Sequence, residues 1–305
     1  MGKKYKLTEE TINVYGRTLH RIESLRDFGN VKKGDKGGFI ENEDNLSQCD
    51  DCWVYDNAKV YNDAVVYDNA MVFKNAKVYG NAMVYGDAQV YGNAQVYGDA
   101  EVFVNAQVYG NAQVFKNAQV YGNARVYGDA EVFGNAEVYG DARVYGNAQV
   151  SGDAWVIGDA KVYGNAMVYG DAKVCGDVRV YGNARVYGNA MVFKNAMVYG
   201  NACVFGDAEI YDNVRVYGNA EVFGNVYIKG DADISSISDY IFFKNWWSSG
   251  RCFTWTRSNN MWSVGCFYGT GKELIEKAYK DSELSGREYK RVVDYVESVL
   301  KEIKS

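Results

Sequence analysis

Apolar and polar positions alternate along most of the chain with a period of six residues. Val or Ile occupies every sixth position from Val54 to Ile234, which makes 31 positions in an unbroken row. Between them the unit reads Val-Tyr-Gly-Asn/Asp-Ala-x, as in residues 90–95. Strand alternation places Val and Ala on one side and x and Tyr on the other. Gly followed by Asn or Asp supplies the residues that best tolerate the positive φ of tight corners. The pattern therefore predicts a β-helix lined by the Val and Ala positions.

This pattern resembles the hexapeptide-repeat, left-handed β-helix superfamily, whose motif is an aliphatic residue followed four positions later by a small one. In that family three hexapeptides form one coil, so residue i stacks on residue i+18. The resemblance implies an all-β solenoid, a left-handed parallel β-helix of about ten triangular coils over residues 54–235. At a strand spacing of about 4.8 Å, this prism would be roughly 50 Å long.

The N-terminal residues carry a second resemblance. Residues 5–53, with Gly37-Gly38-Phe39-Ile40-Glu41 and Asn45-Leu46-Ser47, resemble the cap of YdcK-like proteins of bacteria and their phages. Ile40 and Leu46 are already six residues apart, so residues 40–53 are expected to form a degenerate first coil. We expect an N-terminal β cap over residues 1–53, with strands in 5–30 that close the open end of the prism.

Residues 236–305 depart from the repeat and predict a small α+β domain. Asn259-Asn260 lies between two β-rich runs, as in a hairpin turn. Thr270-x-x-Glu273 and Ser285-x-x-Glu288 both have the spacing of a capping box, so two helices are expected. A two-residue hairpin loop would place one apolar set under the helices, namely Phe253, Trp255, Trp262, Val264 and Cys266.

Charge and hydropathy exclude several classes of partner. The net charge is −6 and neither end carries an acidic or basic tail, so bulk electrostatics imply no nucleic-acid or membrane partner. The first residues lack the apolar run of a signal peptide, and no stretch of 18 apolar residues occurs. We therefore expect a cytoplasmic protein that does not interact with a membrane.

The six cysteines are too sparse for a secreted disulfide framework and favour a reducing compartment. Cys49-Asp50-Asp51-Cys52 has the spacing of half a zinc site, but a tetrahedral zinc needs two further ligands. Cys252 and Cys266 lie beyond the whole repeat. We predict no metal and no cofactor within one chain, and whether Cys49 and Cys52 bind a metal between chains stays open.

The superfamily includes acyltransferases that use a histidine as general base. The only histidine here is His20, in the expected cap, and it is a weak candidate for a catalytic base. The six-residue phase never slips, so the loop that walls the acyl-CoA site in such enzymes is not expected. We predict a non-enzymatic protein. The alternative is an acyl-CoA-dependent acyltransferase whose site forms between subunits around His20.

Outward-facing aromatic residues set this repeat apart. The position after Val or Ile is aromatic in 26 of the 31 units, with 19 Tyr and 7 Phe. Neighbouring rings on adjacent strands stabilise each other by about 0.2–1 kcal/mol per pair. So much ring surface also exceeds what soluble monomers usually expose. We expect a homo-oligomer, with a trimer favoured because members of the superfamily usually trimerise.

One face carries four consecutive cations at the x position, each two residues before a tyrosine. The cations are Arg125, Arg143, Lys161 and Arg179, and the rings beside them are Tyr127, Tyr145, Tyr163 and Tyr181. Like charges stacked about 4.8 Å apart repel, so anions are expected nearby. One source is the chain itself, through Asp141, Asp159 and Asp177 on the adjoining corner. The other is a ligand, because Arg beside an aromatic face suits phosphates and stacked bases.

These observations predict a scaffold for binding or assembly through its aromatic-covered faces. Its ligand would be an anionic small molecule, such as a nucleotide, or a nucleic acid, held by the four cations and the four tyrosines beside them.

Overall fold

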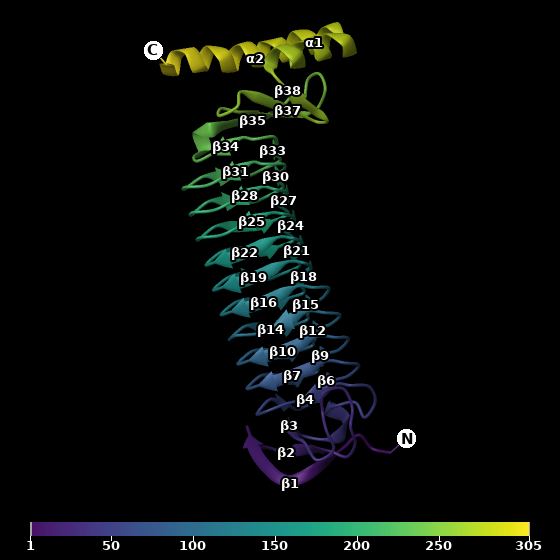
Figure 1. Ribbon diagram of the computed structural model, residues 1–305. Helices are drawn as coiled ribbons and strands as arrows, with labels where there is room; N and C mark the ends of the chain where they lie inside the picture. The colour runs from purple at the N-terminus through teal and green to yellow at the C-terminus, as the bar shows by residue number, and fades with distance from the viewer. Residues whose placement is uncertain (1, 305) are drawn as a thin grey trace.

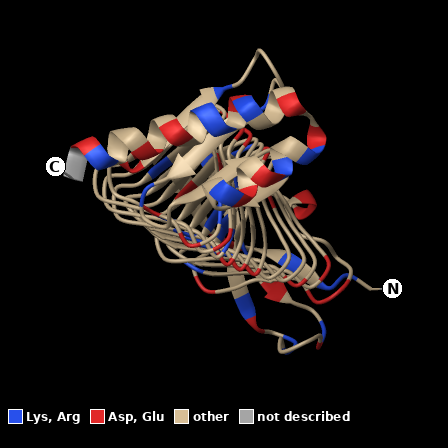
Figure 2. Cartoon of the chain, turned by 90° about the horizontal axis from the view of Figure 1, so that it is seen from above, with Lys and Arg blue, Asp and Glu red and all other residues tan. Residues whose placement is uncertain are grey.

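The repeat coils into a parallel β-solenoid of about eleven turns, with a cap at the N-terminal end and a small domain at the other (Figure 1). This computed structural model describes residues 2–304, the side chains of residues 303 and 304 excepted. Successive strands fall on three long sheets in turn, so the coils superpose into a three-sided outline when viewed along the axis (Figure 2).

Sheet 1 contains 13 strands and includes the cap. Its strands, in chain order, are β1 (Tyr5–Val14), β2 (Arg17–Ser24), β3 (Lys36–Ile40), β5 (Lys59–Val60), β8 (Lys77–Gly80), β11 (Gln95–Gly98), β14 (Gln113–Lys116), β17 (Glu131–Gly134), β20 (Gln149–Val150), β23 (Met167–Gly170), β26 (Arg185–Gly188), β29 (Cys203–Val204) and β32 (Glu221–Val222).

Sheet 2 has 11 strands and sheet 3 has 10. Sheet 2 consists of β4 (Trp53–Val54), β7 (Met71–Lys74), β10 (Gln89–Gly92), β13 (Gln107–Val108), β16 (Arg125–Gly128), β19 (Arg143–Gly146), β22 (Lys161–Gly164), β25 (Arg179–Val180), β28 (Met197–Val198), β31 (Arg215–Val216) and β34 (Asp233–Ile234). Sheet 3 consists of β6 (Val65–Val66), β9 (Met83–Val84), β12 (Glu101–Val102), β15 (Gln119–Val120), β18 (Glu137–Gly140), β21 (Trp155–Gly158), β24 (Lys173–Gly176), β27 (Met191–Lys194), β30 (Glu209–Ile210) and β33 (Tyr227–Ile228).

The interior of the solenoid is formed by the Val and Ala positions, as the sequence predicts. Val144 and Ala142 are fully buried, and the same holds for the equivalent residues of neighbouring coils. Val144 pairs with Val126 on one side and with Val162 on the other, so each core residue stacks on the one 18 positions away. The core is one continuous apolar column that runs the length of the prism.

The corner residues differ from the prediction in which position adopts a positive φ. Positive φ falls on the position after the aromatic residue, as in Gly146 at +73° and Val104 at +63°. The Asn or Asp that follows has no positive φ, so the prediction was wrong for that position. Its side chain instead bonds along the stack: the Asn147 Nδ2 donates to Asn165 Oδ1 at 3.0 Å. The amide hydrogen-bond ladder explains why the corner residue is always Asn or Asp.

The N-terminal cap extends sheet 1 with antiparallel strands, and β1 pairs with β2, which pairs with β3. The short 3-10 helix η1 (Glu43–Asn45) follows β3. Ile40 pairs with Val60 and Leu46 with Val66, each 20 residues later, whereas Trp53 pairs with Met71, 18 residues later. The expected first coil is therefore present, but it is two residues longer than the others.

A buried lysine fills the space that the two extra residues create. Lys4 is fully buried, and its Nζ donates hydrogen bonds to the carbonyl oxygens of Cys49 at 2.9 Å, Asp50 at 3.3 Å and Cys52 at 2.9 Å. The Cys52 Sγ lies 3.2 Å from the same nitrogen. Burial lowers the pKa of Lys4 and raises the pKa of the Cys52 thiol. Lys4 thereby provides hydrogen bonds to three carbonyl groups of the first coil.

The C-terminal residues form an antiparallel sheet between the end of the solenoid and two helices (Figures 1 and 2). After the 3-10 helix η2 (Ile237–Asp239), the strands are β35 (Tyr240–Lys244), β36 (Cys252–Thr256), β37 (Met261–Val264) and β38 (Phe267–Gly269), and the helices are α1 (Gly271–Asp281) and α2 (Glu283–Lys304). One face of the sheet packs on the solenoid core through Tyr240 and Phe242, and the other packs under the helices.

Two details of this domain differ from the prediction. The hairpin turn comprises the four residues 257–260, since Thr256 pairs with Met261. Cys266 is exposed and does not join the apolar face, because β37 ends at Val264 and the chain turns at Gly265. The predicted residues Phe253, Trp255, Trp262 and Val264 are all buried against the helices.

One predicted helix cap is confirmed and the other is wrong. Thr270 and Glu273 form a capping box at the start of α1. Ser285 lies inside α2, which begins at Glu283, and its backbone N–H donates to the hydroxyl of Ser282 at 3.0 Å. No helix of the described residues is both long enough and apolar enough to cross a bilayer.

Candidate functional site

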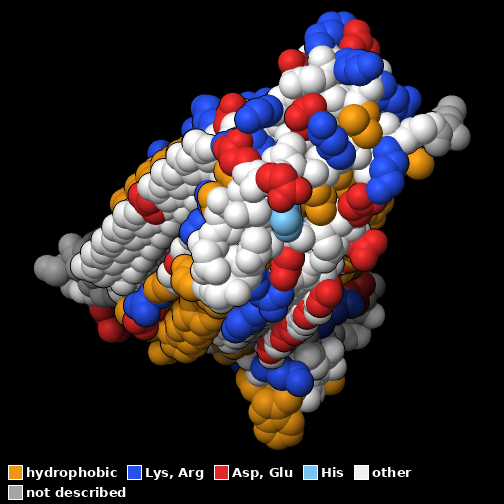
Figure 3. Space-filling model, turned by 90° about the horizontal axis from the view of Figure 1, so that it is seen from below, with side chains coloured by type: hydrophobic (Ala, Val, Ile, Leu, Met, Phe, Trp, Pro, Cys, Tyr) orange, Lys and Arg blue, Asp and Glu red, His pale blue; other side chains and the backbone are white. Residues whose placement is uncertain are grey.

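The four predicted cations form a single column on sheet 2. Arg125, Arg143, Lys161 and Arg179 are the first residues of β16, β19, β22 and β25. They are direct partners in the parallel register, Arg125 with Arg143, Arg143 with Lys161, and Lys161 with Arg179. We call this column, together with Tyr127, Tyr145, Tyr163 and Tyr181, the basic face. Rows of one kind of side chain also run along the prism in the space-filling view (Figure 3).

The tyrosines of the basic face form a continuous stack beside the cations. Tyr127, Tyr145, Tyr163 and Tyr181 have successive ring centroids 4.9–5.0 Å apart, with planes within 4° of parallel. Tyr109 and Tyr199 continue the stack at either end. Both faces of every ring on the basic face are therefore covered by its neighbours. The hypothesis that bases stack on these rings is wrong, because only ring edges and hydroxyls face outward.

The hydroxyls of the basic face lack a hydrogen bond that several tyrosines of the other two faces make. On the other two faces, four tyrosines donate to a Glu or Gln 16 positions later, as Tyr85 does to Glu101 at 2.8 Å and Tyr121 to Glu137 at 2.8 Å. On the basic face that position holds a cation, which cannot accept a hydrogen bond. In the described part of the chain, the hydroxyls of Tyr127, Tyr145 and Tyr163 consequently have no hydrogen-bond partner.

These hydroxyls remain donors at neutral pH. Burial raises the pKa of Tyr127, Tyr145 and Tyr181, although nearby arginines partly oppose the shift. A phenol that keeps its proton can donate a hydrogen bond to an anion. The exposed polar atoms of the basic face are thus ammonium, guanidinium and hydroxyl groups, all of which can donate to an anion.

The predicted ion pairs between the four cations and the adjoining aspartates are not formed. Where a carboxylate stacks directly on a cation in this solenoid, an ion pair results, as between Arg215 and Asp233 at 2.6 Å. Among residues 2–304, no carboxylate lies within ion-pair distance of the four cations of the basic face. The carboxylate of Asp141 instead accepts a hydrogen bond from Asn123 Nδ2 at 3.0 Å.

A hollow of about 430 Å³ adjoins the basic face on its corner side. It is lined by Lys161, Arg179 and Met197, and on the corner by Asp159, Asp177, Asn195 and Asn213. The two carboxylates make this side of the cation column electrically mixed. An anion would therefore meet less repulsion on the opposite side, between the cations and the tyrosine hydroxyls.

The other predicted functional residues lie in the cap. His20 pairs with Ile40 across β2 and β3, and its Nδ1 lies 3.1 Å from the carbonyl oxygen of Thr8. Cys52 is buried against Lys4, whereas Cys49 is exposed. The described residues contain no group of three or more His, Cys, Asp or Glu side chains that could hold a metal ion. A catalytic role for His20 stays a prediction.

The geometry defines the class of protein as a parallel β-solenoid that is built from a six-residue repeat and has one donor-rich face. The repeat of this chain is similar to the β-solenoid repeat of the YdcK family. The family described as YdcK Beta solenoid repeat matches it over residues 76–92, 118–134, 136–152, 160–176 and 184–199. A search of curated proteins finds no match to this chain.

Proposed function

We propose that this protein is a non-enzymatic scaffold that binds a phosphate-bearing polymer along its basic face. The observation that carries this proposal is the donor-only character of the face. Four stacked cations have no carboxylate partner in the described part of the chain, and the hydroxyls beside them have no acceptor. A polyanion would satisfy both groups at once.

The spacing favours a linear ligand that runs along the prism axis. The tyrosine rings repeat every 4.9–5.0 Å along the axis, and the cations form a parallel column in the same strand register. Arg binds phosphate through two parallel hydrogen bonds, and Lys binds it as a point charge. Because the ring faces are covered, contacts would go to phosphates and not to bases. Binding would thus be independent of nucleotide sequence and sensitive to salt.

Fluorescence polarisation with a labelled single-stranded oligonucleotide at low salt tests the proposal, with inorganic polyphosphate as competitor. With four neutralised phosphates, the logarithm of the binding constant should fall with the logarithm of salt concentration with a slope of about −3. Displacement by polyphosphate would identify the phosphate chain as the recognised feature. If polyphosphate does not compete, the ligand class is wrong.

Two matched double variants locate the binding surface. Arg143→Glu with Arg179→Glu should weaken binding by more than about a hundredfold, because each lost charged hydrogen bond contributes about 1.5–3 kcal/mol. Lys77→Glu with Arg185→Glu changes the net charge equally but lies on sheet 1. That control should weaken binding much less. Equal losses in both variants would show that bulk charge, and not the basic face, drives binding.

A further inference from the structure

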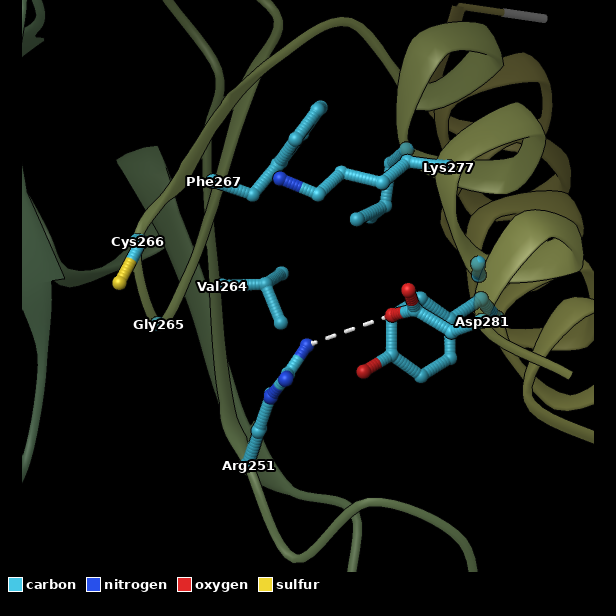
Figure 4. Close-up of a pocket in the computed structure, with 10 residues that line it drawn as sticks. Arg251, Val264, Gly265, Cys266, Phe267, Lys277 and Asp281 are labelled. Carbon is cyan, nitrogen blue, oxygen red and sulfur yellow. Dashed lines mark ion pairs between the residues drawn. The ribbon is translucent and has the colours of Figure 1, made fainter.

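A second hollow lies in the C-terminal domain, far in sequence from the basic face. It is a hollow of about 330 Å³ between the four-stranded sheet and the helices (Figure 4). Its wall comprises Arg251, Val264, Gly265, Cys266, Phe267 and, from the helices, Leu274, Lys277, Ala278, Asp281 and Tyr289. This volume is near the lower end of the range of about 300–1,000 Å³ typical of ligand sites.

The inner wall of the hollow is apolar. Val264, Leu274 and Ala278 are each at most 2% exposed, and they belong to the core of the domain. These side chains offer no hydrogen bonds to a ligand. Contact with them would favour a ligand that presents hydrocarbon to the inner end of the space.

Tyr289 lines the hollow, and its hydroxyl lacks a protein partner among the described residues. The residue is 3% exposed, and its ring packs edge-to-face against Phe253 at 4.6 Å. Within residues 2–304, no hydrogen bond is formed by its hydroxyl. The hydroxyl of a largely buried tyrosine normally has a hydrogen-bond partner, from the protein or from water. A ligand in the hollow is in position to supply the missing one.

Two cations approach the space from opposite sides. Figure 4 shows Lys277 reaching from α1 towards Phe267 and Arg251 rising from the sheet towards Asp281. The Lys277 Nζ lies 5.7 Å from the Phe267 ring centroid and has no carboxylate at ion-pair distance among the described residues. The Arg251 guanidinium lies 3.8 Å from Asp281, which leaves most of its donors available. The three ionised groups together carry one net positive charge.

We propose that this hollow binds a small carboxylic acid with an apolar body the size of one ring or a short branched chain. The carboxylate lies between Arg251 and Lys277, and the Tyr289 hydroxyl donates one hydrogen bond to it. The hydrocarbon part contacts Val264, Leu274 and Ala278. This site is independent of the basic face, and either can fail without the other.

Isothermal titration calorimetry on the full chain tests this proposal with phenylacetate and isovalerate as ligands and phenylacetamide as the neutral counterpart. At least one acid should saturate a single site, and the amide should bind at least about tenfold more weakly than phenylacetate, because it lacks the charge that Arg251 and Lys277 recognise. Equal affinity for phenylacetate and phenylacetamide would overturn the proposal. So would the absence of saturable binding of both acids at millimolar concentration.

Three variants assign the contacts. Lys277→Ala should weaken binding by about tenfold or more, whereas Lys280→Ala, an equally exposed lysine of α1 outside the hollow, should leave affinity unchanged. Tyr289→Phe keeps the ring in the core and should weaken binding by about tenfold or more, as expected for one hydrogen bond to a charged group. Equal weakening by the two lysine variants, or unchanged affinity in Tyr289→Phe, would contradict the assigned geometry.

Discussion

Tyrosine acidity in the solenoid is governed by burial within the ring stacks. Desolvation is the main cause that raises the pKa of Tyr61, Tyr79 and Tyr211 to about 12, from an ordinary value of 10.0. Other stacked tyrosines shift in the same direction, among them Tyr127 and Tyr145. The folded chain therefore holds these protons more tightly than the unfolded chain does.

This shift predicts a loss of stability at alkaline pH. A group whose folded pKa is raised stabilises the fold fully below its unfolded pKa, and that stabilisation is lost as pH rises through the folded value. The free energy of unfolding should thus fall steeply between pH 10 and pH 12. Urea unfolding at a series of pH values, with phenolate absorbance followed in parallel, measures it. A flat stability profile across this window would show that the rings are not buried as described.

Lys4 shows what the sequence could not reveal at the scale of single residues. Its three carbonyl partners lie 45–48 positions later, and they converge only because the first coil is two residues longer. No local pattern marks Lys4 as buried. The free hydroxyls of the basic face, by contrast, could have been found from the sequence, since a cation occupies the position where Glu or Gln elsewhere accepts the bond.

At the scale of elements, predictions that rest on which face of a strand a residue occupies stay correct even where a local detail, such as the turn length, is wrong. The hairpin turn is two residues longer than predicted, yet an even shift keeps Trp255 and Trp262 on the same face. Helix boundaries were less secure. The Ser285-x-x-Glu288 spacing predicts a helix start at Ser285, but α2 begins at Glu283 and the Ser285 N–H donates to the hydroxyl of Ser282. The short connection between α1 and α2 decides in favour of Ser282.

Two valines, one in the core and one at a corner, allow a matched test of which valines face inward. Val144 is fully buried, whereas Val104 is 45% exposed and has a φ of +63°. Val144→Asp should destabilise the fold by several kcal/mol, roughly the cost of burying an unpaired polar or charged group. Val104→Asp carries the same change of charge at a corner, where a carboxylate has both solvent and a nearby backbone donor.

Val104→Asp should leave stability unchanged or raise it by about 1 kcal/mol, because the left-handed conformation is costly for a β-branched residue. Asp68 occupies the equivalent position in another coil, and its Oδ2 accepts a hydrogen bond from Gly86 N at 3.0 Å. Thermal unfolding of both variants measures the contrast. Similar melting temperatures for Val144→Asp and Val104→Asp would refute the inward assignment of the valine column.

At the scale of the whole molecule, the uninterrupted phase of the repeat specified the solenoid, its core and its stacking register. The prediction of a homo-oligomer rested on exposed aromatic surface, and the preference for a trimer rested on the resemblance to the superfamily. The rings stack with their faces covered, so that surface is smaller than the sequence suggested. The oligomeric state stays a prediction, and light scattering would test it against the mass of 34.1 kDa for one chain.

The register of the solenoid also predicts how whole repeats can be removed. Deletion of residues 147–152 removes one six-residue unit and joins Gly146 to Asp153, which keeps every Val in phase. Everything beyond the deletion then moves by one face of the prism. Met167 becomes the stacking partner of Arg143, and Lys161 and Arg179 move to another sheet. The four-membered cation column is thereby split into two pairs.

Deletion of residues 195–200 is the matched control, because it removes an equally uncharged unit beyond Arg179 and leaves the column whole. Both variants should unfold cooperatively at similar temperatures, since each coil contacts only its neighbours and the core phase is preserved. Only the 147–152 deletion should weaken polyanion binding, and the salt dependence of the remaining binding should be about half as steep, because two stacked cations replace four. Equal binding by the two variants would show that the polyanion does not bind at the basic face. If only one variant failed to fold, the six-residue phase alone would not determine the solenoid.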